Sequence, residues 1–221
     1  MIVDASSRTR RTLGRTLRVA LVAALVAVGP GCVAARPPAE FERIAEILSV
    51  RPGMSVADVG AGDGEWSEDL ARRVGEAGCV YATEIEQDDV EQIRERMELA
   101  GLNNVRALLG ERRDAGLPRA CCDAILLRMV YHHFTDPPEM RASLRRALEP
   151  GGLIAVIEIE PQESWERLAG VPERGGHGIR AEDLIDEMTS DGFELVARYD
   201  DWEGGDDRFC VVFRRSAAAD G

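Results

Sequence analysis

The chain has 221 residues, of which 27 are basic and 40 acidic, and its formal net charge is −13. This length accommodates one domain with a sizeable core and a short appendage, but not two domains of comparable size. From Arg36 onward the chain carries 22 basic and 39 acidic residues, a net charge of −17. This negative charge repels phosphate backbones and anionic lipid surfaces. It therefore argues against nucleic acid as a partner and favours a small neutral or cationic substrate.

Residues 1–35 have the three parts of an export signal, namely an arginine-rich start, the apolar run Val19–Val28, and small residues after it. The run is too short to span a bilayer comfortably. Cleavage near Ala35, lipidation of Cys32, twin-arginine export through "TRRTLG", an uncleaved anchor and an upstream extension all remain open. We therefore expect an export signal or anchor at 1–35 and a folded domain at 36–221. This predicts a periplasmic or lipoprotein location with membrane attachment through the N-terminus alone, or a cytoplasmic one if the signal is spurious.

From Glu40 onward, helix-like and strand-like segments alternate, which predicts a mostly parallel α/β sheet. Helices are expected at 41–48, 67–75, 88–102, 136–152 and 181–192, and strands at 55–60, 79–85, 104–110, 122–130, 153–159, 193–200 and 209–215. The first five strands should be separated by helices. The last two strands, joined by a turn-rich segment, should pair as an antiparallel hairpin at the sheet edge. The predicted fold is an α/β, Rossmann-like, doubly wound seven-stranded sheet.

Capping residues mark several helix ends. Ser67 is expected to cap the second helix and Gly75 to end it. The D-x-x-E pattern at Asp88 and Glu91 predicts a capping box, and Gly101 the end of that helix. The fourth helix should have Asp136 as its cap, Pro137 in its first turn and Glu139 closing a box, with Gly151 after its end.

The five cysteines include no C-x-x-C pair and have no histidine at metal-binding spacing. This indicates neither a disulfide framework nor a zinc site. Cys121 and Cys122 open an apolar run, so small buried hydrophobic residues are the expected interpretation.

The stretch "VADVGAGDGEWS" combines a buried strand with glycines at 60, 62 and 64. In a strand–turn–helix unit, such glycines let the main chain turn tightly and approach a ligand at the carboxyl ends of the strands. Glu84, at the end of the second strand, is placed to accept hydrogen bonds from a ribose diol. The third glycine comes one residue earlier than in the dinucleotide fingerprint. Asp63 and Glu65 would also repel a pyrophosphate, so the loop suits a cofactor that is not anionic there.

With these features the chain resembles the class I S-adenosylmethionine-dependent methyltransferases, over about residues 40–215. The resemblance rests on "VADVGAGDG", "YATEIE", "GERRDAGLP", "CDAILLRMVYHHF" and "LEPGG", which occur in this order. Within that superfamily the chain looks most similar to the small-molecule branch that includes the ubiquinone and menaquinone biosynthesis methyltransferases. The resemblance implies S-adenosyl-L-methionine as the cofactor and methyl transfer to a small-molecule acceptor.

The resemblance also implies roles for individual residues. Asp58 and the loop would hold the methionine portion, Glu84 the ribose, and Ile85 would pack on the adenine. Either Glu111 or Asp114 would meet the adenine amino group, with Glu111 preferred. Leu127 and Arg128 would line the cofactor, and Arg128 would also face the substrate. The implied cofactor-binding set is Asp58, Gly60, Ala61, Gly62, Gly64, Glu84, Ile85, Glu111, Asp114, Leu127 and Arg128.

The chain has three histidines, His132, His133 and His177, all expected near the pocket. Methyl transfer to oxygen or carbon requires removal of a proton, and histidine titrates in a suitable range. His132 and His133 are the catalytic candidates, with Tyr131 a weaker one, and Arg128, His133 and His177 are candidate substrate contacts. A helix cap or a packing role is the alternative for the histidines. No metal site is expected, because adjacent residues such as His132 and His133 usually point in different directions.

Two functions therefore stand at this stage. One is a methyltransferase that acts on a small molecule. The other is a non-catalytic exported protein that keeps the fold as a binding module. The pattern does not name the methyl acceptor or the oligomeric state.

Overall fold

The computed structural model describes residues 39–166, 169–205 and 207–216. The expected signal at 1–35 lies outside the described residues. Among those described, no helix is long and apolar enough to cross a membrane.

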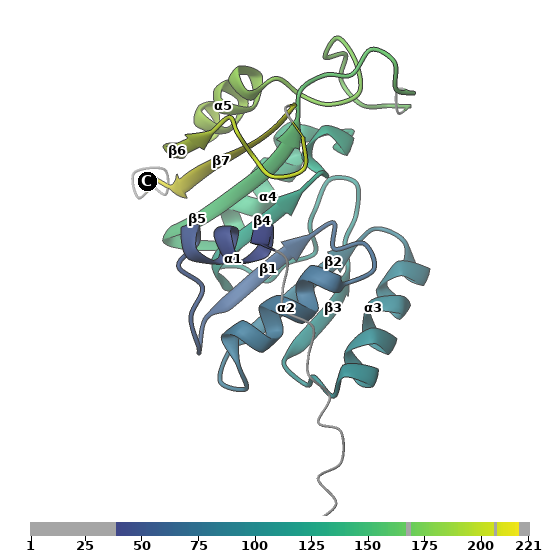
Figure 1. Cartoon of the computed structure of the whole chain (residues 1–221), viewed down its shortest axis with the longest axis vertical. Helices are drawn as coiled ribbons and strands as arrows, with labels where there is room; N and C mark the ends of the chain where they lie inside the picture. Colours follow the sequence, from purple (N-terminus) through teal and green to yellow (C-terminus); the bar gives the residue numbers. More distant parts are fainter. Residues whose placement is uncertain (1–38, 167–168, 206, 217–221) are drawn as a thin grey trace, which may run out of the picture. The chain divides into compact units, whose positions relative to one another are not determined.

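The described residues form a seven-stranded sheet with helices on both faces (Figure 1). The elements are α1 (Ala39–Ile47), β1 (Ser55–Val59), α2 (Glu65–Val74), β2 (Cys79–Glu84), α3 (Gln87–Ala100), β3 (Val105–Leu109), β4 (Cys122–Arg128), the 3₁₀ turn η1 (Tyr131–His133), α4 (Pro137–Ala147), β5 (Leu148–Ile159), α5 (Ala181–Ser190), β6 (Phe193–Tyr199) and β7 (Arg208–Arg215). The strand order is β3-β2-β1-β4-β5-β7-β6. Strands β1 to β5 are parallel, and β7 is antiparallel to both β5 and β6. The predicted fold class and C-terminal hairpin are confirmed.

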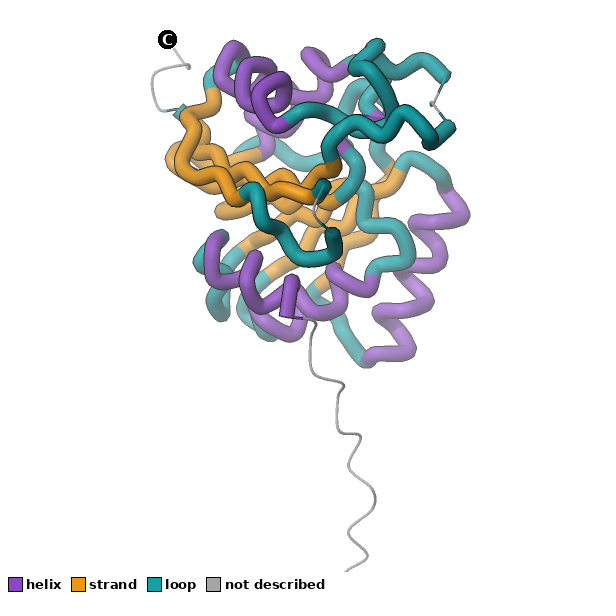
Figure 2. Tube along the Cα trace, turned by 45° about the horizontal axis from the view of Figure 1, so that its top comes forward, coloured by secondary structure: helices purple, strands orange, loops and turns teal. Residues whose placement is uncertain are grey.

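Figure 2 shows helices on either side of the sheet. Two clusters of buried side chains, one on each face, hold these helices against the strands. Alternate residues of a strand point to opposite faces, so Val56 packs with α1 and α2 whereas Ala57 faces the opposite layer. Helix α3 contributes Ile93 and Met97 against Ala82, on the face of α1 and α2. Helices α4 and α5 cover the other face. The segment 154–157 of β5 packs apolar side chains on both faces of the sheet, as its hydrophobic run predicted for a strand covered on both sides.

The register aligns the carboxyl ends of the central strands. Val59 of β1 lies opposite Thr83 of β2 and also opposite Leu127 of β4. Successive connections leave in opposite directions from β1 and β4, so the loops after these strands meet at the topological switch point of the sheet. In open α/β sheets, ligands bind at this position.

Several predicted helix caps are wrong. Helix α2 begins at Glu65 after Gly64, and Ser67 lies inside it, where its hydroxyl donates to Asp58 instead of capping. Helix α3 begins at Gln87, so Asp88 and Glu91 form no capping box. Asp136 and Pro137 do occupy the first positions of α4, but no side-chain cap bond forms there. The endings at Gly75 and Gly101 are confirmed, since both glycines have positive φ.

No helix separates β3 from β4, which corrects the expectation that helices lie between all of the first five strands. Residues 110–121 instead form an irregular connection with a single bridge between Glu111 and Asp114. The glycines at 110 and 116 and the proline at 118 interrupt any helical pattern in this segment.

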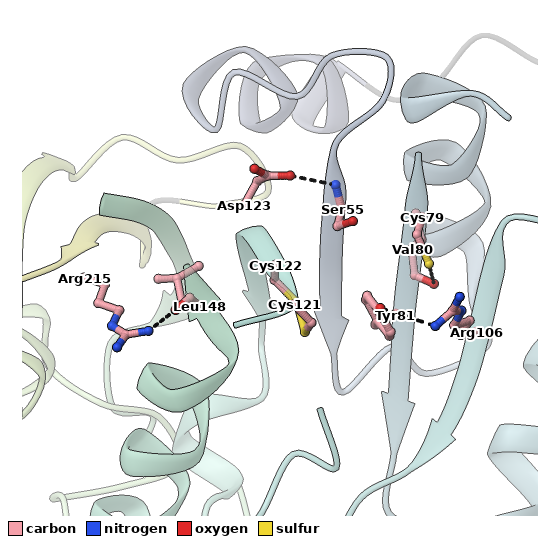
Figure 3. Close-up of a disulfide and its surroundings, with 10 residues drawn as sticks. All are labelled: Ser55, Cys79, Val80, Tyr81, Arg106, Cys121, Cys122, Asp123, Leu148 and Arg215. Carbon is pink, nitrogen blue, oxygen red and sulfur yellow. Dashed lines mark hydrogen bonds between the residues drawn. A yellow bond between two sulfur atoms is a disulfide. The ribbon is translucent and has the colours of Figure 1, made fainter. Parts of the chain in front are cut away.

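The structure joins Cys121 and Cys122 in a disulfide at the start of β4 (Figure 3). This corrects the interpretation of the pair as unlinked hydrophobic residues, although Cys122 is fully buried in the core as expected. Cys79 and Cys210 are free thiols.

Gly60 is the glycine of the β1–α2 loop that the fold constrains most. Its φ is 72°, and a Cβ there would lie 2.4 Å from Cγ2 of Val130. Gly62 also has a positive φ of 57°, but a Cβ there would meet nothing within 4 Å. We expect Gly60→Ala to lower the free energy of unfolding by about 2–4 kcal/mol and Gly62→Ala by about 1 kcal/mol, because only the first adds a steric clash to the left-handed strain.

Urea unfolding of both variants measures this difference. Val130→Ala should relieve part of the Gly60→Ala penalty in a double-mutant cycle. Equal losses for the two glycine variants would contradict the close approach.

Candidate functional site

The loop after β1 is shaped by backbone hydrogen bonds to the end of β2. The amides of Gly60 and Ala61 donate to the carbonyl of Thr83, at 3.0 and 3.1 Å. The amide of Gly62 donates to Oε1 of Glu84 at 2.7 Å. Gly60, Gly62 and Gly64 all have positive φ. The three glycines therefore serve a tight left-handed turn that is fastened to the second strand.

A cavity of about 280 Å³ opens at the carboxyl ends of β1, β2 and β4. Of the predicted site residues, Gly60, Glu84, Ile85, Glu111, Asp114 and His133 line it. The remaining lining residues were not singled out from the sequence: Val59, Thr83, Gly110, Arg112, Ala115, Met129, Val130, Phe134, Thr135 and Met140. The segments that follow β1, β2, β3 and β4 thus converge on one cavity.

Two acids near the third strand differ in how they are bound. Asp114 accepts hydrogen bonds from the Gly116 amide and the Ser143 hydroxyl, each at 2.9 Å, and from Arg146 at 2.6 Å. These bonds and the Arg146 charge lower the pKa of Asp114 despite its partial burial. The side chain of Glu111 is exposed and forms no comparable network among the described residues. Glu111 therefore keeps its carboxylate available to a ligand, whereas Asp114 anchors the loop to α4.

Some predicted site residues lie away from the cavity. Leu127 is fully buried in the core. The Arg128 guanidinium lies 3.2 Å from Glu40 and 4.7 Å from the centroid of the Trp66 ring. Met129 and Val130, one and two residues later, line the cavity instead. The strand was expected at 122–130, but β4 ends at Arg128, so Met129 and Val130 follow the strand and face the cavity.

Tyr131 is also in the core and does not line the cavity. Its hydroxyl donates to Glu187 at 2.7 Å and accepts from Arg141 at 2.9 Å. Burial, followed by the Glu187 charge, raises the pKa of Tyr131 far above its ordinary value. The phenol is thus held neutral as a structural link between η1, α4 and α5, which is a correction to its candidacy as a catalytic group.

The three histidines come together, and we call His132, His133 and His177 the histidine cluster. The rings of His132 and His133 lie 4.2 Å apart between centroids, because both residues belong to the 3₁₀ turn η1. The expectation that these neighbours diverge is therefore wrong. His177 approaches from the loop before α5, with Nε2 lying 3.0 Å from Nε2 of His132.

Glycines flanking His177 allow its loop to lie against the end of β5. A Cβ at Gly178 would lie 2.6 Å from the carbonyl oxygen of Ile159, and one at Gly176 would lie 2.9 Å from the carbonyl carbon of Gln162. Gln162 and His177 pair through backbone hydrogen bonds of 2.9 and 3.2 Å. The motif "ERGGHGIR" is thus a device for holding one imidazole at the cluster.

Glu158 lies beneath the cluster and was not singled out from the sequence. It is fully buried in β5, and its Oε2 lies 2.6 Å from Nδ1 of His132. Its Oε1 accepts the amide of His132 at 3.2 Å. An acid inside the otherwise apolar run "LIAVIEI" was the signal available, since a buried carboxylate requires partners.

His133 is the member of the cluster that lines the cavity. Desolvation of its ring, together with the neighbouring His132, lowers the pKa of His133 to about 4. At neutral pH this imidazole is uncharged, so one of its ring nitrogens carries an available lone pair.

Comparisons with known proteins agree with this geometry. Residues 56–152 match the family model described as a methyltransferase domain. A protein-L-isoaspartate O-methyltransferase of Pyrococcus horikoshii is 31% identical over 135 residues, which is 61% of this chain and 57% of that protein. A solved S-adenosylmethionine-dependent methyltransferase of Aquifex aeolicus superposes with a TM-score of 0.66 at 24% identity, covering 79% of this chain and 89% of the other.

Residues 56–152 thus match a methyltransferase domain, and the described fold is that of solved S-adenosylmethionine-dependent methyltransferases. Nocamycin O-methyltransferase of Saccharothrix syringae is 31% identical over 139 residues, which is 63% of this chain and 50% of that protein. The ubiquinone/menaquinone biosynthesis C-methyltransferase UbiE of Ralstonia pickettii is 29% identical over 120 residues, 54% of this chain and 48% of that protein. The chain thus spans about half the length of these curated relatives.

This similarity implies S-adenosylmethionine as the cofactor, and the residues present fit it. The left-handed loop presents backbone rather than side chains at Gly60, and the Glu84 carboxylate and the half-exposed Ile85 border the same cavity. The acids around the loop favour the positively charged sulfonium over an anion.

Asp58 lies behind the loop with 3% exposure, and its Oδ2 accepts the Ser67 hydroxyl at 2.6 Å. Desolvation raises the pKa of Asp58 to about 6, with the Ser67 hydrogen bond opposing and the Glu84 charge assisting. A raised folded-state pKa means that the folded protein holds this proton more tightly than the unfolded chain. Stability is therefore lost as the pH rises from about 4 to about 6, by roughly 3 kcal/mol.

We expect the Asp58→Asn variant to lack this contribution. Its free energy of unfolding should therefore rise relative to that of the native protein as the pH increases from about 4 to about 6. Ser67→Ala should extend the loss to higher pH, because a hydrogen bond to the ionised form is removed. Urea unfolding at pH 4, 5, 6 and 7 measures these differences. Parallel curves for the native protein and Asp58→Asn would contradict the raised pKa.

Proposed function

We propose that this chain transfers the methyl group of S-adenosylmethionine to a small-molecule acceptor. The observation that carries the proposal is the single cavity that joins the glycine loop and Glu84 on one side to His133 on the other. A donor held at the first side would place its methyl group near an acceptor at the second. Methyl transfer is an in-line displacement, so alignment and exclusion of water supply most of the catalysis.

The cofactor would bind along the strand ends. Asp58 and the glycine loop would hold the methionine portion, Glu84 the ribose hydroxyls, and Ile85 one face of the adenine. Glu111 is preferred for the adenine amino group because Asp114 is already bound by Arg146, Ser143 and Gly116. Oε1 of Glu84 accepts the Gly62 amide and Oε2 accepts the Ile85 amide at 3.2 Å, and each carboxylate oxygen keeps a second acceptor position for a ribose hydroxyl.

The acceptor would bind beside the histidine cluster. The net charge of −17 on the chain from Arg36 onward disfavours a polyanionic substrate. The names of two relatives refer to small molecules, nocamycin and ubiquinone or menaquinone, whereas a third refers to isoaspartate in proteins. An oxygen or carbon acceptor would lose its proton toward the cluster as the methyl group arrives.

A second candidate is a non-catalytic exported protein that retains the fold. The signal-like composition of residues 1–35 favours it, since S-adenosylmethionine is a cytoplasmic metabolite. The fold also serves other chemistry: the [4+2]-cyclase SpnF superposes with a TM-score of 0.65 at 19% identity, covering 80% of each chain. Methyl transfer separates the candidates, because a non-catalytic module could bind the nucleoside but would not pass on its methyl group.

Calorimetry on the full chain with S-adenosylmethionine, and separately with its demethylated product, tests the first step. We expect both to bind. Radiolabelled methyl donor, supplied with a cell extract divided by size, should then label the small-molecule fraction. Failure of both nucleosides to bind at millimolar concentration would exclude the enzyme, and label only in macromolecules would exclude the small acceptor.

Glu84→Ala should weaken cofactor binding about 5- to 150-fold, equivalent to about 1–3 kcal/mol, because a charged acceptor for the ribose is lost. Glu84→Gln can still accept the Gly62 amide, so it separates the hold on the loop from the contact with the ribose. Glu86→Ala, on the exposed residue that precedes α3, is the matched control. Unchanged affinity in Glu84→Ala would refute the assignment.

A further inference from the structure

The rings of His132 and His177 face each other through the same type of atom. Nδ1 of His177 lies 2.8 Å from the carbonyl oxygen of Glu166, which can only accept, so Nδ1 carries a proton. Nδ1 of His132 lies 2.6 Å from Glu158, and it donates when Glu158 is a carboxylate, the form favoured by the two backbone amides that also donate to Glu158. In the neutral tautomers, both Nε2 atoms therefore present lone pairs, and these atoms are 3.0 Å apart.

Two lone pairs at this distance repel unless a cation lies between or beside them. Glu158 also favours a positive charge nearby, because its side chain has no exposed surface. It accepts hydrogen bonds from the His132 ring and from the amides of His132 and Ile159. Buried charges in proteins are paired or lie near a bound metal. Either a proton or a metal ion would satisfy the pair, and His133 distinguishes them.

His133 brings a third imidazole to the same place. One ring nitrogen from each of His132, His133 and His177 lies within 4.8 Å of the others. A shared proton requires only two nitrogens. Three imidazoles are the ligand set of a zinc site that keeps one position open, with Zn–N distances of about 2.0–2.1 Å. Four-coordinate geometry at those distances separates ligand nitrogens by roughly 3.4 Å. The Nε2 atoms of His132 and His177, now 3.0 Å apart, would move slightly apart, and the His133 ring would rotate toward them.

The surroundings match what metal-binding histidines usually have. Such a histidine donates its other ring N–H to a carboxylate or a backbone carbonyl, which fixes the tautomer and orients the ring. His132 has the carboxylate of Glu158 and His177 has the carbonyl of Glu166. Imidazole ligands favour zinc, copper, nickel and iron over the hard ions magnesium and calcium.

We propose that the histidine cluster, His132, His133 and His177, binds one divalent transition-metal ion, with Zn²⁺ as its representative. Glu158 and the Glu166 carbonyl act as positioning groups. The open position would take water or an acceptor oxygen, since His133 also borders the cavity. This last consequence rests on the proposed function, but metal binding itself does not. The proposed metal site differs from the expectation, drawn from the sequence, that the chain has no metal site.

The test is titration of the full chain, without a histidine tag, with Zn²⁺ alone in competition with a chromophoric chelator. Co²⁺ in place of Zn²⁺ gives a visible spectrum that reports four-coordinate nitrogen ligation. The chain has only three histidines, so no histidine outside the cluster can contribute. We expect one equivalent to bind with a dissociation constant below about 1 µM, since structural and catalytic zinc sites bind tightly.

His177→Ala and His133→Ala should each weaken Zn²⁺ binding at least about 100-fold and abolish the Co²⁺ spectrum. Neither residue is buried, so these variants should retain the fold, as circular dichroism would verify. Glu158→Gln keeps the shape and should weaken binding about 10- to 100-fold. Glu163→Gln, on an exposed acid of the same loop, is the matched control for adventitious cation binding and should change nothing.

Absence of stoichiometric binding, or binding unchanged in His177→Ala and His133→Ala, would overturn the proposal. The second result would place the ion at carboxylates or free thiols instead. S-adenosylmethionine binding measured on the same preparations keeps the two proposals separate. Loss of metal binding would leave the binding of S-adenosylmethionine unchanged, and loss of S-adenosylmethionine binding would leave the binding of metal unchanged.

Discussion

The close approach of Gly60 to Val130 is the constraint on which the site depends. A hydrogen atom at Gly60 lets the loop after β1 touch the loop after β4, and a methyl group there would lie 2.4 Å from Val130. Met129 and Val130 line the cavity, and η1 begins at the next residue, Tyr131. The glycine-loop side and the histidine side of the cavity therefore meet where the Gly60 main chain packs against the Val130 side chain, at the switch point of the sheet.

Two buried acids lie behind the two ends of this cavity, and their hydrogen-bond partners differ. Asp58 lies behind the glycine loop, where a single hydroxyl opposes a large desolvation penalty, so its pKa rises to about 6. Glu158 lies beneath the histidine cluster and is bound to His132 at 2.6 Å. A cationic ligand would compensate each of them, a sulfonium above the first and a metal ion above the second. Asp58 and Glu158 are thus the two positions at which the acidity of this domain would favour binding of a cation.

Most of the fold followed from local patterns. The seven strands, the C-terminal hairpin and the cofactor loop were predictable because apolar runs, glycines and turn residues report on nearest neighbours in the chain. Helix starts were less predictable, since Ser67 has the chemistry of a cap but is drawn into the core by Asp58. The missing helix between β3 and β4 and the Cys121–Cys122 disulfide were likewise not anticipated.

The sequence by itself determined the fold class, the methyltransferase resemblance, and the placement of Gly60, Glu84 and Glu111 together at the carboxyl ends of the strands. Only the tertiary structure decided that Tyr131 and Leu127 belong to the core, that Asp114 is already bound, and that three histidines meet over Glu158. The physical reason is the range of the interactions. Strand and turn propensities act over a few residues, whereas the cluster joins β5, the turn η1 and a loop 45 residues beyond His132. Such a meeting depends on sheet register and on glycines that admit a distant loop, and neither is visible in the spacing of the histidines.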